Sequence, residues 1–428
     1  MEQLSTLLQR LFALHRFGIR PGLERIEALL HAFGNPHRRY PAIHVTGTNG
    51  KGSVCAMTAS ALLAQGYRVG LYTSPHLCHF SERIRIAGKP VAEEALATYL
   101  PSLLRQAERI GATFFEVTTA LAFILFAEYD IEIAVVEVGM GGRYDATNVL
   151  SPLAAVVTSI DYDHEQYLGS SLQEIAWQKA GIFKPNCAAL IGERRPWLQE
   201  LLYRWAAESS STPVAPSAIP TLVAATPNFC QLLRLPSGTE LLLPLAGEHQ
   251  RWNLAITLRL IELLSDRFPT SMESLAEGLQ NVRHWGGLRA RIEPLRLHPP
   301  LIVDVAHNPS GIAALLRALD EHGYSSTHWH VVFGAMADKD ISAMLRLLQP
   351  RTAFLYACAP RTERALPPDQ LVRLAHQQGI QQCEQYPTVA DAVQRAYARR
   401  TPTLVVGSFY LVSEALEALR PICTESCS

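Results

Sequence analysis

Short runs of consecutive apolar residues alternate with longer stretches of helical apolar spacing in the first part of the chain. Four short runs are AIHVTG (42–47), YRVGLYTS (67–74), IEIAVVEVG (131–139) and LAAVVTSID (153–161), and the last two are almost continuous in Ile, Val and Ala. Strands buried on both faces have this composition, and they belong to parallel sheets that carry helices on both sides. We therefore predict an α/β fold of the doubly wound kind.

A second series of short apolar runs begins near residue 301, with helical segments between them. Its members are LIVDVAHNP (301–309), HWHVVFGAM (328–336), AFLYACAP (353–360) and PTLVVGSFY (402–410). This pattern predicts a smaller Rossmann-like α/β unit at the C-terminal end. Proline density rises and regular patterning stops in RIEPLRLHPP (291–300), so we place the domain boundary there. The predicted domains are residues 1–293 and 294–428.

The stretch from Pro196 to Thr239 shows no regular pattern, and its middle is rich in Ser and Pro. We interpret it as loop and edge strand.

Composition narrows the classes of partner. The chain has 428 residues, of which 48% are hydrophobic and 18% charged, with a net charge of −1. This balance argues against nucleic acid or an anionic membrane as the main partner.

No apolar run approaches the roughly 18 residues of a membrane span, and the charged N-terminal stretch 1–20 does not have the pattern of a signal peptide. The eight scattered cysteines form no C-x-x-C pair, which favours reduced thiols. We expect a cytoplasmic monomer.

The stretch VTGTNGKGS (45–53) lies between a predicted strand and a predicted helix. It departs from the standard P-loop pattern, because position 45 is Val and Gly52 separates Lys51 from Ser53. Its glycines still allow successive backbone N–H groups to face one anion, and the helix N-terminus and Lys51 add positive charge. The spacing leaves two interpretations: a phosphate-binding loop or a glycine-rich turn without a ligand.

Further motifs decide between them. Residues 47–53 match the loop G-T-N-G-K-G-[ST], and other segments follow in order: GLERIEALLHAFGNP (22–36), TSPHL (73–77), FSERIRIAG (80–88), EVGMGGRYDATN (137–148), TSIDYDHEQYLG (158–169), QKAGIFKP (178–185), GEHQRWNLA (247–255), DVAHNP (304–309), FGAMADKD (333–340) and VVGSFYLVSE (405–414). In these motifs the chain resembles the folylpolyglutamate synthase and dihydrofolate synthase family, relatives of the Mur ligases. The resemblance implies a P-loop-type, mostly parallel sheet flanked by helices. It also implies ATP binding by the loop residues Gly47, Thr48, Asn49, Gly50, Lys51, Gly52 and Ser53.

Divalent cations must accompany a nucleotide triphosphate, and oxygen ligands are expected where the strands end. Ser74, Glu137 and His164 each end or follow a predicted strand. Taken singly, they could be a turn cap, a solvated strand end and a loop histidine. By resemblance they hold magnesium, with two sites expected.

Lys179 lies in the last turn of a helix that we predict from the capping box at Ser171 and Glu174 to Gly181. A lysine there ordinarily complements the helix dipole. The resemblance implies instead that Lys179 reacts with carbon dioxide to give a carbamate that helps to hold a metal. That chemistry requires a neutral amine and therefore a depressed pKa.

The remaining ATP contacts are expected from the resemblance at Asn253, Asp304 and His307. Relatives carry a Pro-Gly-Arg motif near the domain junction, whereas this chain reads HWGGLRARIEP (284–294). We select Arg291 as the arginine that reaches the ATP phosphates, with Arg289 as the alternative.

The acceptor substrate is expected beside the metal site. By resemblance Asp145 and Ala146 lie near the pterin, and the loop that contains Arg83 closes over it. Arg83 and Arg143 could equally be surface arginines. The residues of the glutamate site are not assigned.

The resemblance implies an ATP-dependent ligase that adds L-glutamate to dihydropteroate and to reduced folates through an acyl phosphate. Lys51, Lys179, His164 and Arg291 are the expected catalytic residues. The alternatives are a monofunctional folylpolyglutamate synthase, a Mur-type ligase of UDP-sugar peptides, and a nucleotide-gated adaptor. The Mur-type alternative is disfavoured by the segment SPHL (74–77) with SERIRI (81–86), and because the loop begins at residue 45, without a separate UDP-binding domain before it.

Overall fold

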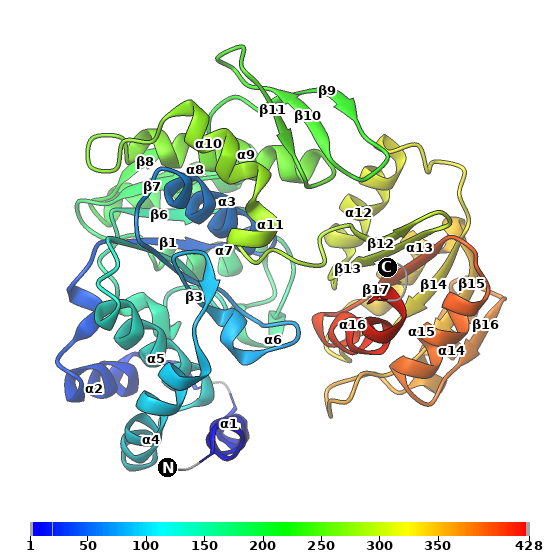
Figure 1. Ribbon diagram of the computed structural model, residues 1–428, viewed down its shortest axis with the longest axis horizontal. Helices are drawn as coiled ribbons and strands as arrows, with labels where there is room; N and C mark the ends of the chain where they lie inside the picture. Colours follow the sequence, from blue (N-terminus) through cyan, green and yellow to red (C-terminus); the bar gives the residue numbers. More distant parts are fainter. Residues whose placement is uncertain (1–2, 19, 425–428) are drawn as a thin grey trace. The chain divides into compact units, whose positions relative to one another are not determined.

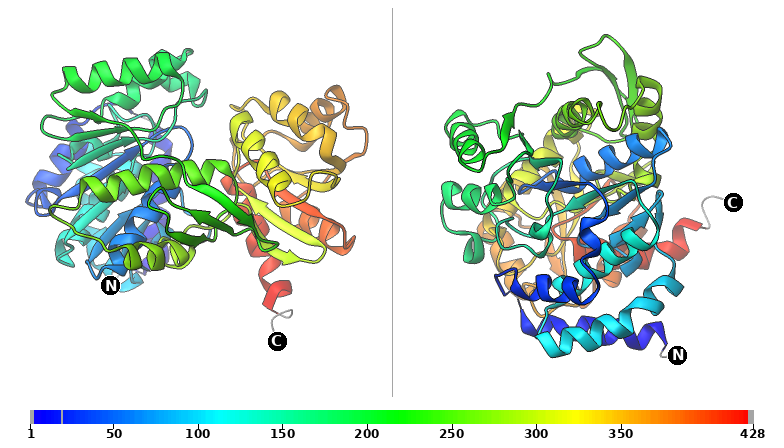
Figure 2. Two further views of the ribbon diagram at one scale, coloured as in Figure 1. Left: turned by 90° about the horizontal axis from the view of Figure 1, so that it is seen from above. Right: turned by 90° about the vertical axis from the view of Figure 1, so that its left-hand side faces the viewer.

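The computed structural model describes residues 3–18 and 20–424 and divides into two compact units. The first unit contains the chain up to Ile219 together with Asn253–Leu288. The second contains Pro220–Trp252 and the chain from Arg289 onward. Figure 1 labels the helices and strands, and Figure 2 gives two further views.

The first unit is built on an eight-stranded sheet with the order β4-β3-β2-β5-β1-β6-β7-β8. All neighbours pair in parallel except β3 with β2 and with β4, which are antiparallel. The strands are β1 (Ala42–Thr46), β2 (Val69–Tyr72), β3 (Ile84–Ile86), β4 (Lys89–Pro90), β5 (Ile133–Glu137), β6 (Ala154–Val157), β7 (Ala188–Ile191) and β8 (Thr212–Val214). Strands β1, β5 and β6 are buried throughout, as their unbroken apolar runs predict.

Helices cover both faces of this sheet. In Figure 1, α3 and α10 lie on one side of β1, and α5 and α2 lie on the other. The elements are α1 (Leu4–Ala13), η1 (Leu14–Phe17), α2 (Glu24–Ala32), η2 (Pro36–Arg38), α3 (Lys51–Ala64), η3 (Phe80–Arg83), α4 (Glu93–Ile110), α5 (Phe114–Glu128), η4 (Ala146–Val149), α6 (Glu165–Leu168), α7 (Leu172–Ala180), α8 (Pro196–Glu208), α9 (Glu248–Leu263), α10 (Met272–Gln280) and α11 (Val282–Trp285).

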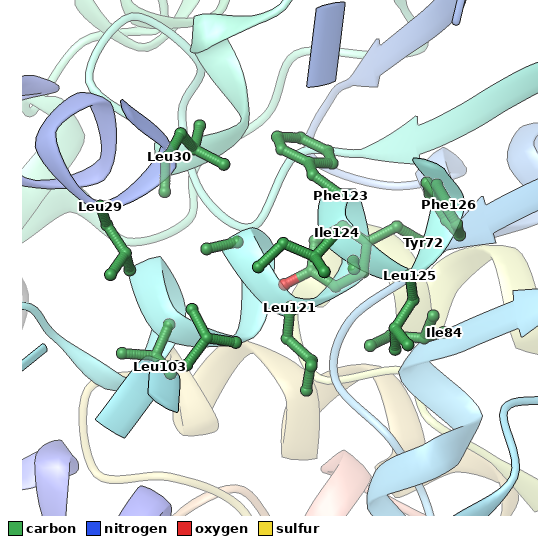
Figure 3. Packing of buried hydrophobic residues seen from close by; sticks show 14 of the residues in the cluster. Leu29, Leu30, Tyr72, Ile84, Leu103, Leu121, Phe123, Ile124, Leu125 and Phe126 are labelled. Atoms are coloured by element: carbon green, nitrogen blue, oxygen red, sulfur yellow. The ribbon is translucent and has the colours of Figure 1, made fainter. Parts of the chain in front are cut away.

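Helix α5 forms the centre of the largest described core. Its sequence, FFEVTTALAFILFAE, is apolar on almost every side, and such a helix must be buried all round. Figure 3 shows Leu121 and Phe123 of α5 among Leu29 and Leu30 of α2.

The second unit contains a three-stranded antiparallel sheet and a six-stranded sheet of order β12-β13-β17-β14-β15-β16. In the larger sheet only β12 is antiparallel to its neighbour. The elements are β9 (Thr221–Ala225), β10 (Gln231–Arg234), β11 (Glu240–Leu243), β12 (Glu293–Leu297), β13 (Pro300–Asp304), α12 (Pro309–Glu321), β14 (Trp329–Phe333), α13 (Ile341–Leu348), η5 (Gln349–Arg351), β15 (Thr352–Ala357), α14 (Pro368–Gln377), β16 (Cys383–Gln385), α15 (Val389–Ala398), β17 (Thr403–Val406) and α16 (Phe409–Thr424).

The predicted α/β class, the flanked parallel sheet and the smaller C-terminal α/β unit are confirmed. The units nevertheless differ from a boundary at residue 293, because Pro220–Trp252 groups with the second unit. Phe229 is fully buried with its ring 5.5 Å from that of Tyr324, and Arg251 pairs with Glu321 at 3.0 Å. These contacts tie the segment to α12 and the chain after it.

Two local predictions were wrong. Pro196–Glu208 forms α8, which begins with Pro at a first-turn position where the missing N–H is harmless. The expected join at residues 291–300 instead supplies β12, the antiparallel edge strand of the second sheet. Proline is compatible with an edge strand, so its density did not indicate a linker.

Two further observations concern the described residues alone. No helix among them is long and apolar enough to cross a membrane. Six cysteines are free thiols: Cys55, Cys78, Cys187, Cys230, Cys358 and Cys383. The side chains of Cys423 and Cys427 lie outside the described part of the chain.

Candidate nucleotide and metal site

The loop between β1 and α3 requires glycine at two positions. Gly47 and Gly50 have φ values of 149° and 91°. A Cβ atom at Gly47 would lie 1.9 Å from Oγ1 of Thr158, and one at Gly50 would lie 2.5 Å from Oδ1 of Asn253. Both glycines therefore allow a close approach that a side chain would block. The approach at Gly50 also shows that Asn253, predicted from a distant motif, lies directly against the loop.

Residues that follow β6 brace the loop. Ser159 donates from Oγ to the carbonyl of Asn49 at 3.0 Å and accepts the N–H of Asn49 at 3.1 Å. The N–H of Thr48 donates to the carbonyl of Ser159 at 2.8 Å, and Thr48 Oγ1 accepts the N–H of Asp161 at 2.9 Å. These hydrogen bonds hold the loop backbone in one conformation, as a phosphate cradle requires.

Lys51 is the first residue of α3, and its ammonium group folds back over the loop. Its Nζ donates to the carbonyl of Gly47 at 2.9 Å and to that of Thr48 at 3.2 Å. Ser53, the third residue of the helix, is 2% exposed. The structure thus brings together the predicted loop residues, including Gly52, at the N-terminus of a 14-residue helix. Its positive end and Lys51 favour an anion at the same place.

Glu137 and Ser74 lie together at the carboxyl ends of β5 and β2. The Glu137 side chain is buried, and its Oε2 accepts the N–H of Ser74 at 3.0 Å. Val45 of β1 is the register partner of Glu137, so Glu137 faces the same side of the sheet as the residue that leads into the loop. A buried carboxylate beside a phosphate loop suits a divalent cation.

His164 follows β6 and precedes α6 with a left-handed backbone, φ 53°. Its Nε2 lies 3.9 Å from Oδ1 of Asp163, which also accepts the N–H of His164 at 2.9 Å. Asp163, which is not among the residues predicted from the motifs, thus bonds to the His164 backbone and lies near its imidazole. The signal was present in the sequence, since Asp161 and Asp163 both follow a buried strand.

Lys179 is 3% exposed in the last turn of α7, where the predicted capping box at Ser171 and Glu174 is present. Burial and the nearby Lys51 lower the pKa of Lys179 to about 7, although Asp163 and Asp145 oppose the shift. A large fraction of the amine is therefore neutral near pH 7 and available as a nucleophile. This is the state that carbamate formation requires.

Among the described residues there is no group of three or more His, Cys, Asp and Glu that could hold a metal by themselves. The predicted set contains only one carboxylate and one imidazole of that kind, with the Ser74 hydroxyl and Lys179 beside them. Oxygen and imidazole donors at the carboxyl end of a parallel sheet fit magnesium or manganese. A carbamate on Lys179 would add oxygen ligands that the unmodified chain lacks.

Three of the predicted ATP contacts belong to the second unit and lie in or next to β12 and β13 in the sequence: Arg291, Asp304 and His307. Asp304 ends β13 and accepts the N–H groups of Ile292 and Ala306, both at 2.8 Å. Burial raises the pKa of Asp304, although Arg291 opposes the shift. The guanidinium of Arg291 lies 5.2 Å from the ring centre of Phe409, whose ring also lies 5.9 Å from that of His307.

Arg289 differs from Arg291 in its partner. Its Nε lies 2.7 Å from Oε1 of Glu293, and its side chain is 48% exposed. This surface ion pair occupies the Arg289 guanidinium, whereas Arg291 lies beside the Asp304 carboxylate. The comparison favours Arg291 as the arginine that serves a ligand.

Asp145, one of the residues expected for the acceptor substrate, lies close enough to Lys179 for their charges to interact. Asp145 is buried and accepts the N–H groups of Met140 and Thr147, both at 3.0 Å, and burial raises its pKa. Ala146 follows it as the first residue of η4 and is 5% exposed. Arg83 is buried too, with Nε 2.7 Å from Nδ1 of His76, so it is not a surface arginine.

Arg143 precedes this group, and its guanidinium stacks on the Trp177 ring at 3.8 Å. This stacking holds Arg143 against α7, the helix that carries Lys179.

Comparison with known proteins identifies the family. Residues 45–258 match the Mur ligase middle domain, and residues 290–409 match the Mur ligase glutamate ligase domain. A dihydrofolate synthase/folylpolyglutamate synthase of Bacillus subtilis is 31% identical over 429 residues, covering 95% of this chain and 96% of the relative. The chain belongs to the Mur ligase family. Its place is in the folylpolyglutamate synthase and dihydrofolate synthase branch, and it is an ATP-dependent ligase.

One relative is longer than the chain. A probable bifunctional folylpolyglutamate synthase/dihydropteroate synthase of Haloferax volcanii is 34% identical over 95% of this chain, which spans only 49% of that relative. The Mur-family match therefore concerns about half of the archaeal protein.

Solved structures agree with the family. A Mycobacterium tuberculosis folylpolyglutamate synthase complexed with ADP and AMPPCP has a TM-score of 0.86 and 32% identity, covering 97% of this chain and 98% of its own. A Yersinia pestis bifunctional folylpolyglutamate synthase/dihydrofolate synthase complexed with AMPPNP and Mn ion has a TM-score of 0.82 and 29% identity, covering 98% of both chains. These complexes support the use of ATP and a divalent metal by the family.

Proposed function

We propose that this chain adds L-glutamate to dihydropteroate and to reduced folates, with ATP as co-substrate and an acyl phosphate as intermediate. The observations that support the proposal are the braced phosphate loop, Glu137 as the register partner of Val45 just before that loop, and the buried Lys179, which is close enough to Lys51 for their charges to interact. The near-complete match to the Bacillus subtilis enzyme supports the same pair of activities.

The chemistry follows from the need to activate a carboxylate. Condensation of a carboxylate with an amine is uphill in water, so the γ-phosphoryl group of ATP is transferred to the terminal carboxylate of the pteroate or folate. The amine of L-glutamate then attacks the acyl phosphate carbon, and phosphate leaves. Lys51, from the first unit, and Arg291, from the second, are proposed to stabilise charge on the transferring group.

Two magnesium ions are proposed to be held by Glu137, His164, Ser74 and a carbamate on Lys179. Bound magnesium would neutralise phosphate charge. The pKa of Lys179, lowered to about 7 by burial and by Lys51, supports carbamate formation. In this step the neutral Nζ attacks the carbon of carbon dioxide. An N–C bond forms while one C=O π bond breaks and leaves its electron pair on oxygen, and Nζ loses one proton to solvent.

The two units are proposed to divide the work. The first would bind ATP and the pterin, with Asn253 against the loop and Asp145, Ala146 and Arg83 on the pterin side. The second would bring L-glutamate, together with Arg291, Asp304 and His307 for the nucleotide. We propose a cytoplasmic monomer that uses small-molecule substrates and binds neither nucleic acid nor a membrane.

One assay tests the function. ADP release is measured with magnesium and L-glutamate, while dihydropteroate, a reduced folate or a UDP-sugar peptide is added in turn. We expect release with both pterin substrates. Release with the folate alone would indicate a monofunctional folylpolyglutamate synthase, and release with the UDP-sugar peptide alone would overturn the proposal. ATP turnover that ignores glutamate and every acceptor would indicate an adaptor.

A further inference from the structure

Glu193 is a buried carboxylate outside the residues discussed so far, at the carboxyl end of β7. It is 3% exposed and directly follows Gly192, where a Cβ atom would lie 2.8 Å from the carbonyl oxygen of Thr158. Gly192 also donates its N–H to the carbonyl of Val157 at 2.7 Å. The glycine thus brings Glu193 against the segment that follows β6.

The Glu193 carboxylate joins two parts of the chain. Its Oε2 accepts the N–H of Ile160 at 2.8 Å. Its Oε1 accepts the N–H of Arg194 at 3.0 Å, together with the N–H and Nε of Arg195, both at 2.8 Å. Arg195 Nη2 in turn donates to the carbonyl of Ile160. Both polar groups of the Ile160 backbone are therefore held by this one ion pair.

Ile160 lies in the middle of the segment that shapes the site. Ser159, just before it, exchanges two hydrogen bonds with the Asn49 backbone, and Asp161, just after it, bonds to Thr48. Shortly after them come Asp163 and His164. A displacement of Ile160 would consequently shift both the phosphate loop and His164, the histidine expected to bind metal.

We propose that Glu193, with Arg195, is a positioning residue for nucleotide and metal binding. It fixes residues 158–164 and, through them, the phosphate loop and His164. The inference rests on the proposed function only for the identity of the ligand, a magnesium-bound nucleoside triphosphate. Neither Glu193 nor Arg195 is assigned contact with that ligand.

The chain offers a matched control in Glu116. Its side chain is 5% exposed, it pairs with Nε of Arg25 at 3.0 Å, and it accepts the N–H of Thr113 at 2.7 Å. The two carboxylates thus have the same kind of surroundings: burial, an arginine and a backbone N–H. The partners of Glu116 belong to α2 and the start of α5, and none of them lies in residues 158–164.

The experiment measures the Kd of Mg²⁺·AMPPNP by calorimetry, the magnesium concentration for half-maximal binding, and the Tm. It uses the full chain and the variants Glu193→Gln and Glu116→Gln. An amide offers one acceptor oxygen and no charge, so the substituted side chain cannot hold Ile160 and Arg195 together. We expect Glu193→Gln to raise the nucleotide Kd and the magnesium requirement about tenfold, since losing the group that orients a metal ligand has effects of this order. Glu116→Gln should lower Tm comparably and leave both binding values unchanged.

Unchanged nucleotide binding in folded Glu193→Gln would overturn the inference, and so would an equal loss of binding in Glu116→Gln. Should Glu193→Gln fail to fold, Arg195→Gln keeps the carboxylate and its backbone bonds. That variant should still weaken nucleotide binding, and normal binding in it would also overturn the inference. Glutamate-dependent ADP release by the unmodified chain is measured in parallel. Its absence, with nucleotide binding weakened only by the Glu193 and Arg195 variants, would refute the proposed function and leave the positioning role supported.

Discussion

The two units present their candidate site residues at the carboxyl ends of parallel strands, but they hold them in different ways. In the first unit the loop residue Asn49 is bonded to Ser159, 110 residues further along the chain. In the second unit Asp304 bonds to Ile292 and Ala306, only 12 and 2 residues away. The backbone of the phosphate loop is therefore held by hydrogen bonds from a distant segment, whereas the Asp304 carboxylate is held by residues close to it in the sequence.

This difference in bonding indicates what each unit contributes to phosphoryl transfer. Long-range hydrogen bonds hold the backbone of the phosphate loop in the first unit, and a fixed backbone is what electrostatic stabilisation of a transferring phosphoryl group requires. Local bonding at Asp304 and Arg291 fixes two side chains without a comparable cradle. Substitutions in the first unit should accordingly have the larger effects on phosphoryl transfer.

The largest effect is expected for Lys51→Ala. Lys51 is the only full positive charge within the loop 45–53, so its loss should lower kcat by about a thousandfold while Tm changes little. The measurement is glutamate-dependent ADP release together with thermal unfolding. Lys89→Ala, at an exposed lysine of β4, serves as the control and should be fully active. Normal turnover by Lys51→Ala would show that the loop does not take part in the reaction through Lys51.

Lys179 should come next, and its effect should depend on pH and on carbon dioxide. The lowered pKa of about 7 means that Nζ becomes an ammonium group as the pH falls through 7, and an ammonium group cannot form a carbamate. Activity should therefore fall below pH 7 and recover on addition of bicarbonate. Lys179→Ala should lose about a hundredfold in activity and show no bicarbonate response.

The modification itself can be observed with ¹³C-labelled carbon dioxide. A carbamate carbon resonance should appear in the unmodified chain and be absent from Lys179→Ala. If the resonance is missing and bicarbonate has no effect at any pH, Lys179 acts as an unmodified amine and the proposed metal set is incomplete.

A third prediction compares the two arginines at the start of the second unit. Arg291→Ala should lower kcat/KM for ATP by about a hundredfold, because Arg291 is proposed to contact the phosphates. Arg289→Ala removes an ion pair in which Arg289 is 48% exposed and Glu293 is 12% exposed, so it should lower Tm somewhat and leave kcat/KM for ATP unchanged. Steady-state kinetics of both variants decides between them. The reverse order of effects would assign the role to Arg289.

Much of the fold and the site could be predicted from local sequence. The unbroken apolar runs predicted β1, β5 and β6, and the Ser171–Glu174 capping box predicted α7. Asn253 was expected to contact ATP because of its motif, and the structure places it against Gly50 of the phosphate loop. The motif itself did not predict that contact. These features depend on residues close in sequence or on whole motifs.

What could not be predicted depends on pairing between distant segments. Pro220–Trp252 groups with the second unit, and Phe229 of this segment stacks on Tyr324. The local sequence pattern does not predict this contact. Glu193 was missed for the same reason, because its partner Ile160 is 33 residues away. Its one visible signal was a Gly-Glu pair at the end of a buried strand. Prolines misled the prediction at β12, where an edge strand tolerates them.

The smallest expected effect tests the bracing itself with two hydroxyl deletions. Ser159→Ala removes both side-chain hydrogen bonds to Asn49, and Thr388→Ala removes the N-cap of α15 in the second unit, which accepts the N–H of Asp391 at 3.1 Å. Each change should lower the free energy of unfolding by about 1 kcal/mol. Only Ser159→Ala should also raise KM for ATP, by a few-fold, because only its partners lie in the phosphate loop. Chemical denaturation and ATP kinetics on the same preparations measure both quantities. Equal KM values in the two variants would mean that the loop keeps its shape without the hydrogen bonds from Ser159. The two units would then differ in how far apart in sequence their bonded residues are, but this difference would not affect function.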